Sequence, residues 1–185
     1  MDLRKEKPKL DSKELLEYAI KALGRRSQSS SELRSKLRLK AAAASDIEPV
    51  IERLREYRYL DDSRFAENFA VSRRENEGFG RSRTLRELRN RRVSGSTAEA
   101  AVESVYREVD EIAQIESFIR RKFRNEPRDT LFQQDRDLAA AYRRLLRAGF
   151  RSSNVVRVLK RFAKNPELLD AIEPNEGEGP ANDET

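Results

Sequence analysis

The chain has 185 residues, of which 39% are charged and only 37% hydrophobic, and its formal net charge is +6. It contains neither Cys nor His, which excludes disulfides, thiolate or imidazole catalysis, and zinc or haem ligation by these side chains. So polar a composition supports little core per residue, and we expect a thin or elongated body rather than one large globule.

The two ends of the chain differ in charge. Residues 165–185 hold seven acidic side chains and no basic one, so residues 1–164 keep all 39 basic and 26 of the 33 acidic residues, a net charge of +13. A body this basic predicts a polyanionic partner, nucleic acid before a membrane surface. Residues 1–9 lack the apolar stretch of a secretory signal, and no apolar run approaches the roughly 20 residues that span a bilayer, so we expect a cytoplasmic protein. Residues 1–9 and the acidic tail 165–185 are expected to be disordered.

Apolar residues recur at spacings of three and four along the body, which predicts helices, and no alternating strand pattern is evident. The first predicted helix follows Asp11, with Glu14 completing a capping box and Leu10 and Leu15 forming a hydrophobic staple. The segment 41–44 is short of breakers and can extend the second helix. The predicted helix starts, in chain order, include Asp11, Ser29, Ser45, Asp61, Ser96 and Asp110.

The apolar faces of three successive units superimpose without gaps at offsets of 51 and 57 residues. Leu37, Leu88 and Leu145 coincide in one helix of each unit. This repetition predicts an all-α protein of three tandem three-helix repeats, residues 10–60, 61–109 and 110–164, that form an elongated curved array. In the following helix the matching sets are Ile47, Val50, Ile51 and Leu54; Ala98, Ala101, Val102 and Val105; and Val155, Val158, Leu159 and Phe162.

Two clusters of arginine are the candidate binding residues. Guanidinium groups donate paired hydrogen bonds to phosphates and carboxylates, which suits a protein or nucleic-acid partner. The alternative for both clusters is a solvated helix face, and the third-repeat helices also have to pack a core. The middle-repeat cluster is Arg73, Arg74, Arg81, Arg83, Arg86, Arg89, Arg91 and Arg92, and the third-repeat cluster is centred on Arg143, Arg144 and Arg147.

Other conspicuous residues favour structural roles. Asp61 and Asp62 precede a helix without a nearby third ligand, which predicts capping rather than metal binding. The segment 78–80, Gly-Phe-Gly, follows no strand and lacks the Lys of a phosphate-binding loop. No nucleophile has a credible base, so we expect no enzymatic activity, no metal and no cofactor. The aromatic residues at helical spacing, Phe65, Phe69, Phe118 and Phe123, are expected in the core.

Residues 59–69 read Tyr-Leu-Asp-Asp-Ser-Arg-Phe-Ala-Glu-Asn-Phe and resemble the signature segment of the RecX family of bacterial recombinase regulators. That family typically shows Gly-Tyr-Leu-Asp-Asp-x-Arg-Phe-Ala at the start of its second repeat, and the resemblance continues through residues 80–88 and 142–150. Three departures fall where the family commonly has Gly, a residue that permits a left-handed helix cap. At these places the chain has Ala41, Arg58 and Arg92.

The resemblance implies a monomeric protein that binds the RecA nucleoprotein filament, with single-stranded DNA within or beside it, and that restrains filament growth, ATP turnover and strand exchange. The eleven arginines named above are then the expected contacts. A DNA- or RNA-binding regulator with helix-turn-helix-like units that acts without RecA is the alternative, and a helical scaffold for a partner unrelated to DNA is a third possibility.

Overall fold

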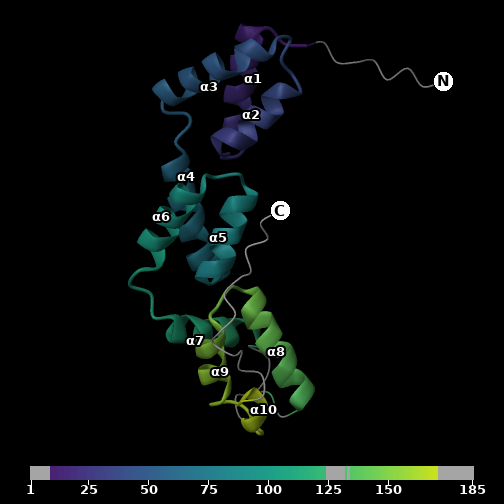
Figure 1. Cartoon of the computed structure of the whole chain (residues 1–185), viewed down its shortest axis with the longest axis vertical. Helices are drawn as coiled ribbons and strands as arrows, with labels where there is room; N and C mark the ends of the chain where they lie inside the picture. The colour runs from purple at the N-terminus through teal and green to yellow at the C-terminus, as the bar shows by residue number, and fades with distance from the viewer. Residues whose placement is uncertain (1–8, 124–131, 133, 171–185) are drawn as a thin grey trace, which may run out of the picture. The chain divides into compact units, whose positions relative to one another are not determined.

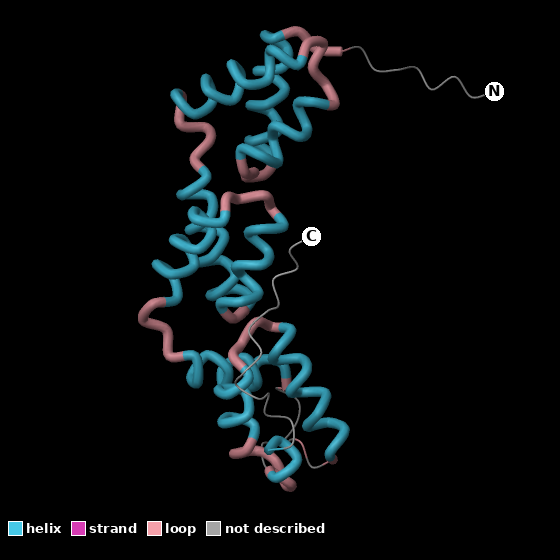
Figure 2. The backbone as a smooth tube through the Cα atoms, in the orientation of Figure 1, coloured by secondary structure: helices cyan, strands magenta, loops and turns pink. Residues whose placement is uncertain are grey.

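The computed structural model describes residues 9–123, 132 and 134–170. All regular structure in these residues is helical, and their one isolated β-bridge joins Leu10 to Ala41 (Figure 2). The predicted all-α fold is confirmed. The chain divides into two compact units, Met1–Ser72 with Leu85–Arg107, and Arg73–Thr84 with Glu108–Thr185.

The helices follow one another in groups of three (Figure 1). Helix α5 (Arg81–Asn90) begins in the second unit and ends in the first, so the predicted middle repeat contributes residues to both. The first unit otherwise contains α1 (Ser12–Arg25), α2 (Ser30–Arg38), the 3-10 turn η1 (Ala44–Asp46), α3 (Ile47–Glu56), α4 (Asp62–Ser72) and α6 (Gly95–Tyr106). The second unit contains the π-helical turn η2 (Arg73–Glu77), α7 (Glu111–Lys122), α8 (Asp135–Arg147), α9 (Ser152–Leu159) and α10 (Glu167–Asp170).

Two of the predicted capping boxes are present. The Asp11 carboxylate accepts from the Glu14 amide at 2.9 Å while the Glu14 side chain accepts from the Asp11 amide at 3.1 Å. Ser29 and Glu32 make the same exchange at the start of α2, at 3.1 and 3.2 Å. Asp110 also caps α7 as expected. These side chains satisfy amide groups that a helix start leaves without partners.

Two predicted starts are wrong by one or two residues. Helix α3 has Asp46 rather than Ser45 at its N-cap, and the cap makes no side-chain bond. Pro49 explains the shift: after Asp46 it is the third helical residue, whereas after Ser45 it would be the fourth, where an amide hydrogen is needed. Helix α6 is capped by Ser94, whose hydroxyl accepts from the Thr97 amide at 3.3 Å, and not by Ser96.

Residues 41–44 do not extend α2, contrary to the prediction. The helix ends at Arg38, and the chain then pairs with the segment before α1. The Leu10 amide donates to the Lys40 carbonyl, and the Ala42 amide donates to the Leu10 carbonyl, both at 2.8 Å. These non-local bonds satisfy backbone groups that the helical alternative would have paired locally.

The turns that were expected to need Gly keep a left-handed conformation without it. Arg58 has φ of 59° and Arg92 has φ of 58°, close to the left-handed region that Gly149 occupies with φ of 93°. At each of the three sites the following amide bonds back to a buried leucine carbonyl, which is the Schellman closure of a helix. A side chain in this conformation costs roughly 1–2 kcal/mol, so both arginines sit in strained turns.

The cores differ in bulk. The first repeat buries large side chains such as Leu15, Leu33 and Ile51, whereas the buried residues of α4 are alanines and those of α6 include two more. The third repeat buries Ile115 and Phe118, and Phe118 meets Phe150 edge to face with ring centroids 5.6 Å apart. The superimposed leucines of the repeat pattern, Leu37, Leu88 and Leu145, are all at most 1% exposed. These buried alanines are Ala66 and Ala70 in α4 and Ala98 and Ala101 in α6.

Residues 1–8 of the predicted disordered N-terminus and residues 171–185 of the acidic tail lie outside the described residues. The described beginning of the tail is helical, because α10 spans Glu167–Asp170. Leu169 is fully buried in the core of the second unit, which gives this acidic stretch an apolar anchor. The prediction of a disordered tail from residue 165 therefore does not hold for residues 167–170.

Candidate functional site

The paired aspartates lie at the joint between the first two repeats, inside the first unit. Asp61 caps its own helix, since its carboxylate accepts from the Arg64 amide at 2.9 Å. Asp62 instead accepts from the Ser30 amide at 2.7 Å and so caps α2 of the preceding repeat. Among the described residues no group of three potential metal ligands is found. The pair is thus a capping pair, as predicted, but one member serves a helix that sequence spacing did not indicate.

Arg91 is the centre of this joint. Its Nη2 donates to the Ser27 carbonyl at 3.2 Å, and its Nε lies 3.0 Å from the Glu32 carboxylate, although the N–H is not aligned for a hydrogen bond. Its guanidinium lies 5.4 Å from the ring centroid of Phe65 and 5.8 Å from that of Phe69. Arg91, predicted as a binding residue, therefore holds two repeats together.

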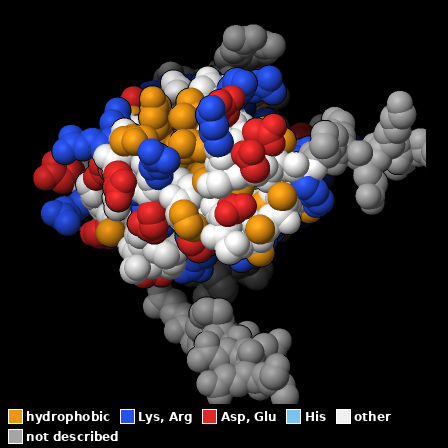
Figure 3. Space-filling view, turned by 90° about the horizontal axis from the view of Figure 1, so that it is seen from above, with side chains coloured by type: hydrophobic (Ala, Val, Ile, Leu, Met, Phe, Trp, Pro, Cys, Tyr) orange, Lys and Arg blue, Asp and Glu red, His pale blue; other side chains and the backbone are white. Residues whose placement is uncertain are grey.

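The other arginines of the first unit differ in their availability. Arg92 donates to the Ser35 hydroxyl, a second link between the repeats. Arg89 pairs with Glu99 at 2.9 Å, but both side chains are more than half exposed. Arg86 is exposed and makes no ion pair or hydrogen bond with another described residue. In the view from above Figure 1, acidic and basic side chains intermingle around hydrophobic ones (Figure 3).

The predicted arginines in the second unit's segment 73–84 are engaged internally. In η2, Arg73 lies 4.0 Å from Glu77 and Arg74 lies 2.7 Å from Glu75. The Arg83 guanidinium stacks 3.6 Å from the ring centroid of Phe79, and Arg81 also has an internal partner. A π-helical turn is rare and often marks a functional site, but here its arginines are paired with its own acids.

Segment 73–84 is anchored on the third repeat by backbone contacts. The Gly80 amide donates to the Ala148 carbonyl at 2.8 Å, and the Ser82 amide donates to the Gly149 carbonyl at 3.2 Å. A Cβ at position 80 would lie 2.3 Å from the Gly149 oxygen, so only Gly fits. The Gly-Phe-Gly segment is a close-packing motif. Arg121 adds hydrogen bonds to the carbonyls of Asn76 and Glu77, at 2.9 Å for Asn76.

The third-repeat cluster lies on the open face of α8. Arg143, Arg144 and Arg147 are all exposed, whereas Tyr142 and Leu145 on the same helix are buried. Arg144 lies 5.5 Å from the ring centroid of Phe123. Arg143 and Arg147 form no hydrogen bond or ion pair with another described residue. Their guanidinium groups are held on a packed helix with their donors directed to solvent or to a partner.

The aromatic residues expected in the core divide into two pairs. Phe118 is buried and Phe123 packs against the same core. Phe65 and Phe69 are only half-buried and line a groove of about 680 Å³ in the first unit, together with Arg91. For this second pair the prediction is wrong, because the buried residues of α4 are Ala66 and Ala70 and the phenylalanines stay half-buried.

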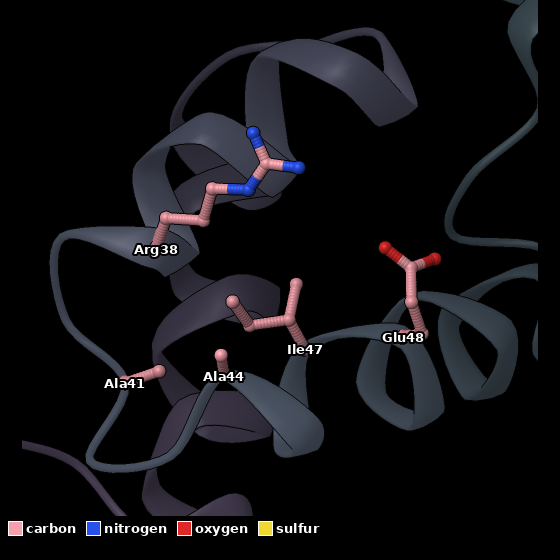
Figure 4. A pocket seen from close by; sticks show the side chains of 5 residues that line it. All are labelled: Arg38, Ala41, Ala44, Ile47 and Glu48. Atoms are coloured by element: carbon pink, nitrogen blue, oxygen red, sulfur yellow. The ribbon is translucent and has the colours of Figure 1, made fainter.

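A second hollow, of about 500 Å³, lies in the first repeat where the expected helix extension is missing (Figure 4). Its floor is Ala41, Ala44 and Ile47, and Arg38 and Glu48 stand on opposite sides. Glu48 is already engaged: Arg34 donates to its two oxygens at 2.6 and 3.0 Å. This hydrogen bonding holds the pKa of Glu48 below its ordinary value and raises that of Arg34.

Tandem three-helix repeats of this kind define an all-helical repeat protein. Two family models match in tandem: the first three-helix domain of RecX over residues 16–54 and the second over residues 61–102. The regulatory protein RecX of Escherichia coli strain SE11 is 31% identical over 159 residues, covering 80% of this chain and 92% of that relative. The chain belongs to the RecX family of regulatory proteins, as the resemblance predicted.

Other comparisons agree. The regulatory protein RecX of Pelodictyon phaeoclathratiforme is 38% identical over 96 residues, which cover 52% of this chain and 58% of that relative. The crystal structure of RecX from Lactobacillus salivarius has a TM-score of 0.62 at 15% identity and covers 82% of this chain and 96% of that one. A second RecX crystal structure gives 0.59 at 20% identity, over 81% of this chain and 73% of the other. These structures support the fold. Among the described helices, none is long and apolar enough to cross a membrane.

Proposed function

We propose that this protein is a non-catalytic regulator that binds the RecA nucleoprotein filament and restrains its growth, ATP hydrolysis and strand exchange. It acts as a monomer in the cytoplasm, in homologous recombination, DNA repair and the SOS response, and needs no cofactor. Membership of a family of regulatory proteins supports a binding role, and the basic body supports a polyanionic or acidic partner.

The observation that carries the proposal is the exposed arginine trio of α8: Arg143, Arg144 and Arg147. One side of α8 is packed into the core of the second unit, which fixes the position of the helix, while the three guanidiniums lie on the other side. Preorganised arginines bind phosphates or carboxylates with little loss of backbone entropy. All eleven predicted arginines remain within the proposal, but those in internal pairs have fewer hydrogen-bond donors left for a partner.

The test compares RecA-dependent ATP hydrolysis on single-stranded DNA with and without the protein. The wild-type protein is expected to slow hydrolysis at or below equimolar amounts. A triple variant, Arg143→Gln with Arg144→Gln and Arg147→Gln, should need roughly tenfold more protein for the same effect, because three charge-assisted contacts are lost. The control variant removes three equally exposed charges of the same unit, Arg120→Gln, Lys122→Gln and Arg136→Gln, and should act like the wild type.

If the wild-type protein leaves RecA activity unchanged at equimolar amounts, the proposal fails. Duplex binding without RecA that is sequence-selective and survives competitor DNA would support the alternative of a direct DNA-binding regulator. A salt titration separates this from non-specific contact, which weakens steeply as salt rises.

A further inference from the structure

The groove beside Phe65 and Phe69 lies within the first unit, between the end of α1 and the beginning of α4. Its volume of about 680 Å³ falls within the range of pockets that hold small organic ligands. Ile20 and Leu23 line it from the α1 side, and both are only partly buried. None of the predicted binding arginines except Arg91 belongs to it.

Aromatic rings dominate the apolar part of the groove. Phe65 and Phe69 are half-buried, with ring centroids 6.2 Å apart and ring planes tilted by 33°. Tyr59, which also lines the groove, is 54% exposed, one of the few large hydrophobic side chains left in solvent. Neither core cluster includes these three rings. Arg91 lies 5.4 and 5.8 Å from the centroids of the two phenylalanine rings, so Tyr59 is the most open of the three rings.

Arginines form the charged part of the same groove. Arg26, Arg58 and Arg64 line it and are exposed, and Arg26 also pairs with Glu32 at 3.4 Å. The one acidic side chain among the lining residues is Asp61, which is occupied by capping α4. The Arg58 and Arg64 side chains make no hydrogen bond or ion pair with another described residue. Position 58 is occupied by Arg although its φ of 59° favours Gly. Strain retained at one residue is often found where its side chain has a function.

We propose that this groove binds single-stranded nucleic acid, with a base against Tyr59 and the phenylalanine pair and the flanking phosphates on Arg26, Arg58 and Arg64. Aromatic faces stack on any base, and guanidiniums neutralise the backbone, which is the usual chemistry of sequence-tolerant single-strand sites. Of the open arginines of α8 only Arg144 lies near a ring, that of the partly buried Phe123, and the trio fits phosphates or carboxylates. The groove would act without RecA, so it is independent of the function proposed above.

The proposal is tested by fluorescence anisotropy of a fluorescein-labelled dT15 oligonucleotide, with RecA absent. Tyr59→Leu keeps an apolar side chain but removes the ring, and should weaken binding by roughly 5- to 150-fold, the range that the loss of one stacked base produces. Tyr59→Phe should bind like the wild type. The double variant Arg58→Gln and Arg64→Gln should lower the slope of log K against log salt by about 1.4, at about 0.7 for each lost phosphate contact.

The matched control is Arg38→Gln with Arg107→Gln, which removes two exposed charges of the same unit outside the groove. An oligonucleotide with abasic sites should bind wild type and Tyr59→Leu equally, because it offers phosphates without a base. Far-ultraviolet circular dichroism checks that each variant keeps its helices.

The proposal is overturned if Tyr59→Leu and the Arg58/Arg64 variant bind dT15 as tightly as the control. It is also overturned if a Glu-rich peptide with one Phe binds the groove in a Tyr59-dependent manner while dT15 does not, since the groove would then be a peptide site. Slowing of RecA-dependent ATP hydrolysis is measured separately, so either proposal can fail alone.

Discussion

The arginines of the middle repeat and those of α8 look alike in sequence but have different surroundings. Of the eight in the middle repeat, only Arg86 lacks an internal partner among the described residues. In α8, Arg143 and Arg147 have none, and Arg144 only lies near the Phe123 ring. The denser cluster is therefore largely structural, and the sparser one is open to a partner.

The difference follows from the cores beneath the two clusters. The buried residues of α4 are alanines, which bury little apolar area, so the middle repeat gains from Arg91 and Arg92, which link it to the first repeat. Helix α8 packs Leu138 and Leu145 into a core with aromatic residues and needs no such links. The density of arginine in a sequence thus does not by itself identify a binding face.

The largest effect is expected where segment 73–84 meets the third repeat. Gly80→Ala should lower the free energy of unfolding by about 3 kcal/mol, because the new Cβ would lie 2.3 Å from the Gly149 oxygen and 2.8 Å from the Phe150 amide nitrogen. Gly95→Ala is the control, since a Cβ there meets no atom within 4 Å and Ala favours a helix. Equal stability of the two variants in urea unfolding would show that the close contact of Gly80 with Gly149 does not fix segment 73–84, which carries Arg81 and Arg83, on the third repeat.

The comparison between the middle-repeat arginines and those of α8 is tested directly by two variants, Arg91→Ala and Arg143→Ala. Arg91 is 24% exposed in its side chain, and its removal should cost about 2 kcal/mol through lost packing on Phe65 and Phe69 and a lost partner for Glu32. Arg143→Ala should change the free energy of unfolding by less than about 0.5 kcal/mol, as is usual for exposed sites. Similar losses in urea unfolding would remove the distinction between clamping and open arginines.

Sequence reasoning succeeded where the determinants are local. Helix caps at Asp11, Ser29 and Asp110 and the repeat of buried leucines depend on spacing along one helix, and the structure has them. The all-α repeat fold and the family could be predicted for the same reason.

The features that sequence reasoning missed depend on distant partners. Nothing local indicates that Asp62 caps α2, 32 residues earlier, or that Arg91 reaches Glu32. The groove beside Phe65 and Phe69 was also missed, because helical spacing predicts burial of a ring but not which neighbour buries it. The signal that could have shown it is the pair of small residues at helical spacing, Ala66 and Ala70, on the neighbouring face of α4.

The strained arginines give a smaller effect of opposite sign. Arg58→Gly should raise the free energy of unfolding by about 1 kcal/mol, because Gly adopts φ of 59° without steric cost. Arg92→Gly should gain less, since it also loses the hydrogen bond to Ser35. Arg58→Ala serves as the control for charge and should be close to the wild type, because it keeps the strain. If neither Gly variant is more stable than the wild type, the two turns are not strained. If the two variants gain equally, the Arg92 hydrogen bond to Ser35 does not link the repeats.

The smallest effect is expected at the exposed pair of Arg34 and Glu48. It is an arginine–glutamate pair like that of Arg91 and Glu32, but it lies in solvent. The pKa of Glu48 is lowered by hydrogen bonding from Arg34, so the pair stabilises the fold above the ordinary pKa of a glutamate, and this contribution is lost as pH falls through the lowered value. Because the Glu48 side chain is 59% exposed, Glu48→Gln should cost about 0.5 kcal/mol at pH 7 and less at pH 3. Urea unfolding at the two pH values checks this, with Glu52→Gln, whose pair with Arg55 joins residues of one helix, as control. A loss at pH 7 as large as that of Arg91→Ala would mean that burial is not what separates the clamping arginines from the open ones.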